Sequence, residues 1–127
     1  MQLFVFILTI SITTIGINLE KAYALGADSS GFVKKISRSY TNKFCNSIAF
    51  GLSKESAMNF SIAENKKVFE RRKEMKSVDQ ELLAEEIAIS VIEKCGYPIN
   101  LSGDKGIKEF KSYYLSKDNE LANKIKD

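Results

Sequence analysis

The two cysteines are the side chains with the most specific chemistry in this sequence of 127 residues. Cys45 and Cys95 each lie on an apolar stretch, near the expected C-terminal end of a helix. In an exported protein they are candidates for one disulfide, which would close a loop of about 50 residues and stabilise the fold by roughly 4 kcal/mol. The alternative is a pair of buried, reduced and independent thiols. Because no C-x-x-C spacing occurs, redox catalysis is not expected.

Histidine is absent, and its absence removes several classes of active site. Ser-His-Asp and Cys-His nucleophile pairs, histidine metal sites and C-x-x-C-H haem attachment all require an imidazole. Two cysteines are also too few for a zinc site made of thiolates alone. We therefore expect no catalytic residues, no metal and no cofactor, and a protein that is not an enzyme.

Carboxylates offer one remaining route to catalysis. Asp79, Glu81, Glu85 and Glu86 lie close together, and Glu81 and Glu85 share a helix face. Paired carboxylates can act as general acid and base, or bind a hard cation. No other ligand type and no glycine-bearing calcium loop accompanies them, so a solvated helix face is the better interpretation. An enzyme that uses these carboxylates on an unknown substrate remains an alternative.

The most basic segment of the chain spans residues 66–76, and Glu64, Glu70 and Glu74 interleave with its cations or directly precede them. The net charge of the whole chain is only +3, which does not favour a nucleic-acid-binding protein. One interpretation is a solvated helix face held by pairs three or four residues apart. The other is a docking face for an acidic protein or for membrane headgroups. The predicted docking face consists of Lys66, Lys67, Arg71, Arg72 and Lys73.

Two short motifs are weaker signals. Residues 103–106 read Gly-Asp-Lys-Gly and resemble the G-x-x-G loop of KH domains, whose glycines let the backbone approach nucleic-acid phosphates. The flanking strands of that domain are missing, so we interpret the loop as the start of a helix. Asn59 and Asn100 begin N-glycosylation sequons, which matter only in a eukaryotic host.

Apolar residues at helical spacing predict the elements that position these side chains. Five of them recur every four residues and indicate a helix over 29–50, stopped at Gly51; they are Phe32, Ile36, Tyr40, Phe44 and Ile48. Ser53 is placed to cap a helix over 54–75. A capping box from Ser77 to Gln80 predicts a third helix over 78–95, with the broadest apolar face of the three.

The C-terminal part of the chain predicts shorter elements. Apolar spacing supports a helix over 107–115 and a last turn over 121–125. No pattern of alternating residues indicates a strand or a hairpin. The predicted fold is therefore all-α, a small bundle of three long helices plus one or two short C-terminal helices.

The N-terminus reads as a signal peptide. Residues 3–17 carry no charge, a run too short for a comfortable membrane span but suited to the apolar region of an export signal. Ala22-Tyr23-Ala24 then provides an A-x-A site, and we expect cleavage after Ala24. The initial region lacks Lys and Arg, which departs from the usual pattern. An uncleaved membrane anchor and a buried core segment are the alternatives. The predicted organisation is a signal peptide over 1–24 and one helical domain over 25–127.

Composition and one sequence stretch indicate a source. Lys outnumbers Arg sixteen to three, with 14 Ile and 8 Asn, a bias typical of an AT-rich genome. With the export signal and residues 43–73, KFCNSIAFGLSKESAMNFSIAENKKVFERRK, the chain resembles small exported proteins of marine picocyanobacteria. The resemblance implies the periplasm or the thylakoid lumen and no functional residues. By analogy with helical proteins of that compartment, we expect a non-enzymatic accessory that binds a membrane protein complex or its lumenal or periplasmic subunits. Nucleic acid is not an expected partner, and membrane contact is expected only through an uncleaved N-terminus.

Overall fold

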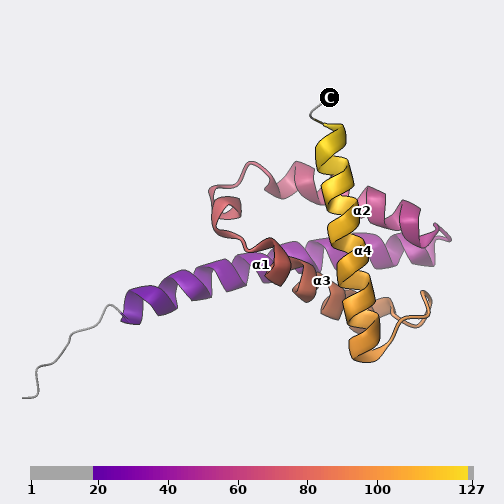
Figure 1. Cartoon of the computed structure of the whole chain (residues 1–127), viewed down its shortest axis with the longest axis horizontal. Helices are drawn as coiled ribbons and strands as arrows, with labels where there is room; N and C mark the ends of the chain where they lie inside the picture. The colour runs from indigo at the N-terminus through magenta and orange to yellow at the C-terminus, as the bar shows by residue number, and fades with distance from the viewer. Residues whose placement is uncertain (1–18, 126–127) are drawn as a thin grey trace, which may run out of the picture.

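The first helix, α1, spans Leu19–Ala49 and is the longest element of the computed structural model (Figure 1). The structure describes the backbone of residues 19–125 and the side chains of residues 29–125. Phe32, Ile36, Tyr40 and Phe44 are buried along one side of α1, as the four-residue spacing predicts. The expected start at Ser29 is wrong, because the helix already begins at Leu19. The predicted stop at Gly51 is confirmed, since its φ of 93° is left-handed.

The second helix, α2, spans Lys54–Phe69, and the side chain of Ser53 caps it by accepting from the amide of Ser56. The predicted continuation to Met75 is wrong. On the face that carries Phe69, the next positions are Arg72 and Lys73, so a longer helix would turn charges toward the apolar core. The chain leaves the α-helix at this point and forms a short 3₁₀ helix, η1, over Lys73–Ser77.

The third helix, α3, spans Gln80–Cys95. Its cap is Asp79, whose carboxylate accepts hydrogen bonds from the amides of Glu81 and Leu82 at 2.9 and 3.1 Å. The expected capping box from Ser77 is therefore wrong. An aspartate two residues later satisfies the free amides of the first turn.

The fourth helix, α4, spans Gly103–Lys124 in one piece. The prediction of a short helix followed by a separate turn is wrong, and residues 19–125 form four long helices rather than three. Two aromatic pairs join α4 to α1 with their rings edge to face: Phe110 on Phe44, with centroids 5.2 Å apart, and Tyr114 on Tyr40, at 5.3 Å. These contacts place α4 across the bundle, as Figure 1 shows.

The described chain is all-α, with no strand between residues 19 and 125, so the predicted fold class is confirmed. Helix α1 packs against both α2 and α3, and α4 packs against α3 and α2. Helix α2 runs antiparallel to α1 after a tight turn, and α3 runs parallel to α1. The parallel arrangement brings the C-terminal ends of α1 and α3 to the same end of the molecule.

Candidate functional site

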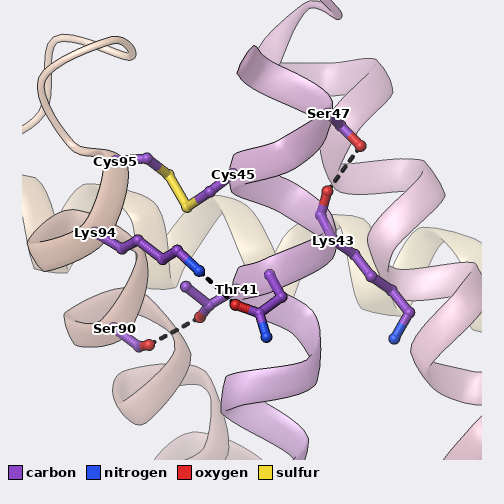
Figure 2. Close-up of a disulfide and its surroundings, with 8 residues drawn as sticks. Thr41, Lys43, Cys45, Ser47, Ser90, Lys94 and Cys95 are labelled. Atoms are coloured by element: carbon purple, nitrogen blue, oxygen red, sulfur yellow. Dashed lines mark hydrogen bonds between the residues drawn. A yellow bond between two sulfur atoms is a disulfide. The ribbon is translucent and has the colours of Figure 1, made fainter. Parts of the chain in front are cut away.

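The two cysteines lie where α1 and α3 meet. Figure 2 shows the disulfide between them. Their Sγ atoms are 2.08 Å apart and their Cα atoms are 5.7 Å apart. Both residues are buried. One turn toward the N-termini of the same helices, the hydroxyl of Thr41 donates to that of Ser90 at 2.9 Å. The disulfide thus fixes the register of two parallel helices at their C-terminal ends.

The five residues of the predicted docking face come from two segments of the chain. Lys66 makes an ion pair with Asp118 of α4 at 3.0 Å, and Lys67 pairs with Glu64 at 2.6 Å. Both lysines lie on α2, before its end at Phe69. Lys66 therefore joins two helices and is only partly exposed to a partner.

The other members of the predicted face are grouped in the connection between α2 and α3. Arg71 and Arg72 lie between Phe69 and η1, and Lys73 belongs to η1, as does Lys76, which is not part of the predicted face. All four are exposed, and none makes an ion pair with a residue that the structure describes. We call residues 70–77 the cationic turn. It carries four cations and the carboxylates of Glu70 and Glu74.

A cavity of about 130 Å³ opens beside the cationic turn. Phe69, which precedes the turn, and Glu70 and Met75, which belong to it, form part of the cavity wall. Its apolar lining is completed by Ile36, Ile62 and Leu83, and its polar lining includes Asn65, Lys66, Asp118 and the ring of Tyr114. A hollow of this size is comparable to engineered cavities that accept benzene. It can take one apolar side chain.

Asn65 fixes the wall of this cavity and was not singled out from the sequence. Its side-chain amide donates to the carbonyl of Ile36 at 3.1 Å, and its Oδ1 accepts from the hydroxyl of Ser39 at 2.9 Å. These bonds tie α2 to α1. A lone polar residue in an apolar stripe, such as Asn65 between Ile62 and Phe69, is the signal that could have identified it.

The carboxylate cluster serves to connect helices. Glu81 and Glu85 both pair with Lys111 of α4 at 3.2 Å, and both are exposed. Their hydrogen bonds raise the pKa of the Lys111 ammonium above its usual value. Asp79 is occupied as the cap of α3. Among the described residues, no group of three or more acidic, cysteine or histidine side chains could hold a metal ion.

The glycine loop starts α4 rather than forming a strand-flanked cleft. Gly103 has a φ of 60°, which places it outside the range that other residues favour. Gly106 is buried, and a Cβ there would lie 3.1 Å from the backbone of Leu101. The sequon asparagines differ in their surroundings: Asn59 is half-buried within α2, and Asn100 is exposed in the loop before α4.

Most of the predicted signal peptide lies outside the described residues, which begin at Leu19 for the backbone. The expected cleavage position after Ala24 falls within the first turns of α1. None of the described helices is both long enough and apolar enough to cross a bilayer.

Comparisons with protein-family models, with curated proteins and with solved structures returned no match.

Proposed function

We propose that this chain is an exported, non-enzymatic helical protein that docks on a protein of a membrane complex in the periplasm or the thylakoid lumen. The observation that carries the proposal is the cationic turn. Four exposed cations in eight residues, beside an apolar cavity, provide a surface for an acidic partner. The residues of this surface are Arg71, Arg72, Lys73 and Lys76.

Export is supported by two independent features. Residues 3–17 are free of charge and are followed by an A-x-A site at residues 22–24. The bonded sulfurs of Cys45 and Cys95 suit an oxidising compartment, because disulfides persist there and are rare in the cytosol. A tethered protein with an uncleaved N-terminus is the alternative, and the intact mass of the natural protein distinguishes the two.

The chemistry of the docking surface indicates what a partner must offer. Arg71 and Arg72 can each bind a carboxylate through two parallel hydrogen bonds, which fix the orientation of that carboxylate as well as attract it. The cavity between Phe69 and Met75 can receive one apolar side chain next to those carboxylates. We therefore expect an acidic segment that carries an aromatic or branched apolar residue.

A charge-reversal experiment tests the docking surface. The protein is purified as the cell exports it, immobilised, and used to capture partners from detergent-solubilised membranes. We expect the double substitution Arg71→Glu/Arg72→Glu to lower recovery of the partner at least about tenfold, since each reversal sets like charges against each other. Both side chains are exposed, so the fold is retained, and circular dichroism checks this.

Lys105→Glu/Lys108→Glu is the matched control. It reverses the same number of charges at exposed positions on α4, away from the cationic turn. The control variant should recover the partner as well as the unmodified protein does. Equal recovery by both double variants contradicts docking through the cationic turn.

A further inference from the structure

The turn after α1 and the loop after α3 meet at one end of the molecule. Three links between these helices join residues of nearly constant separation: Ser37 to the carbonyl of Glu86, Thr41 to Ser90, and Cys45 to Cys95. The separations are 49, 49 and 50, so the two helices run in the same direction and end together. Figure 1 shows both following loops at the end of the bundle away from the start of α1.

These two loops and the helix ends that adjoin them are free of charge. Neither residues 46–53 nor residues 95–103 include Asp, Glu, Lys or Arg, in a chain of which 28% is charged. We call the two segments together the apical tip. An uncharged surface of this extent is unusual for loops, which are generally polar and solvated.

The apical tip displays large apolar side chains. Phe50 is 87% exposed, Tyr97 is 97% exposed and Leu52 is 42% exposed. The backbone beneath them is held in tight turns: the amide of Leu52 donates to the carbonyl of Ser47 at 3.0 Å, and that of Leu101 donates to Gly96 at 2.9 Å. The protruding rings are therefore presented by an ordered scaffold.

The charges that border the tip are balanced. Lys54 is followed by Glu55, Lys94 is preceded by Glu93, and Lys105 is preceded by Asp104. The tip therefore complements an uncharged or zwitterionic surface, and net attraction to anions contributes little. This distinguishes it from the cationic turn.

The apolar area that the tip exposes is small for a protein interface, which favours a lipid surface as its binding partner. An aromatic side chain buries about 150–250 Å², so two rings and a leucine cover less than the ~800 Å² per partner of a standard protein interface. Phe and Tyr that protrude from a scaffold suit the headgroup region of a bilayer, which accepts apolar rings and the phenol hydroxyl together. We propose that the apical tip inserts Phe50 and Tyr97 into the interfacial region of a lipid bilayer. This inference is independent of the proposed docking surface.

Tryptophan fluorescence tests the proposal directly, because the chain has no Trp. The full exported protein carrying Phe50→Trp is mixed with phosphatidylcholine vesicles, with and without brominated acyl chains. We expect the emission to shift to shorter wavelength and to be quenched by the brominated lipid. Adding Tyr97→Ser should raise the lipid concentration needed for this shift about tenfold, since one of the two rings is removed. High salt should have little effect on the lipid concentration needed for the shift.

Phe60→Trp is the matched control. Phe60 is 49% exposed on α2 and lies outside the apical tip. Its emission should not respond to vesicles, even if the N-terminus of the protein is itself bound to lipid. Absence of a shift for Phe50→Trp overturns the proposal, and so do equal shift and quenching at both positions. If the apical tip binds only a protein, the emission of Phe50→Trp will not shift when vesicles are added.

Discussion

Removal of the disulfide should cost a large part of the stability of this fold. The bond between Cys45 and Cys95 joins residues with a sequence separation of 50. Closing a loop of that length lowers the entropy of the unfolded chain by an amount worth about 4 kcal/mol at 25 °C. Single domains have unfolding free energies of only about 5–15 kcal/mol. Loss of the bond should therefore remove a large share of the free energy that keeps the protein folded.

Urea denaturation followed by far-UV circular dichroism measures this contribution. The Cys45→Ala/Cys95→Ala protein should lose about 4 kcal/mol of unfolding free energy relative to the oxidised protein. With a denaturant slope of about 1.5 kcal/mol/M, the midpoint should fall by roughly 2–3 M urea. The slope itself should rise, because an unfolded chain without the cross-link exposes more surface.

Reduction of the unmodified protein is the control for the substitution. Both cysteines are buried, so alanine also removes packed sulfur atoms. Reduction breaks the bond and keeps the sulfurs, and it should produce nearly the same loss. A loss below about 1 kcal/mol in both experiments would refute the loop-entropy reasoning. It would mean that the unfolded chain already holds the two helices together.

Three further predictions concern single side chains. The hydroxyl of Tyr40 is buried with no hydrogen-bond partner among the described residues, so Tyr40→Phe should raise the unfolding free energy by about 1 kcal/mol in the same urea experiment. A Cβ on Gly96 would collide with the carbonyl of Leu101, so Gly96→Ala should lower the melting temperature and reduce the unfolding free energy by about 1–3 kcal/mol. In the control Gly31→Ala, the added Cβ has no atom within 4 Å, and the melting temperature should not fall. Burial raises the pKa of Tyr40 and of Tyr114 above the ordinary value, so the neutral phenols stabilise the fold below pH ~10 and this stability is lost as the pH rises further. Tyr114→Phe should shift the alkaline unfolding midpoint upward in a circular dichroism titration, and an unchanged midpoint would contradict that assignment.

The core of α1 could be predicted from the sequence because it depends on local spacing. Phe32, Ile36, Tyr40 and Phe44 recur every four residues, and one period is enough to place them on one buried face. The end of α2 was also visible in principle. The stripe that contains Phe69 continues into charged residues, but the high helix propensity of those residues favours a longer helix.

The full length of α4 could not be predicted from apolar periodicity. Beyond Tyr114 only Leu115 and Leu121 pack partly against the core, and polar contacts also hold the helix. Lys117 pairs with Glu55 of α2 at 2.7 Å and with Glu120 at 3.2 Å. Glu55 and Lys117 are 62 residues apart, so no local pattern reveals the pair. The hydrogen bonds of Glu55 and Glu120 raise the pKa of Lys117.

The candidate surfaces show the same division between local and long-range information. The basic composition of the cationic turn was evident from the sequence, but the involvement of Lys66 with Asp118 was not, because it requires α2 and α4 to cross. The two uncharged segments of the apical tip were each visible. Their meeting follows from the parallel packing of α1 and α3, which no sequence pattern indicated.

The cationic turn lies inside the disulfide-closed loop, and this position affects how the protein responds to proteolysis. The turn offers exposed Arg and Lys outside any α-helix, which is where trypsin-like enzymes cut. One cut there leaves Cys45 on one fragment and Cys95 on the other, still joined through their sulfurs. The nicked protein would run as one band without reductant and as two with it. Cleavage in the cationic turn would therefore leave helices α1 to α4 in a single covalent molecule.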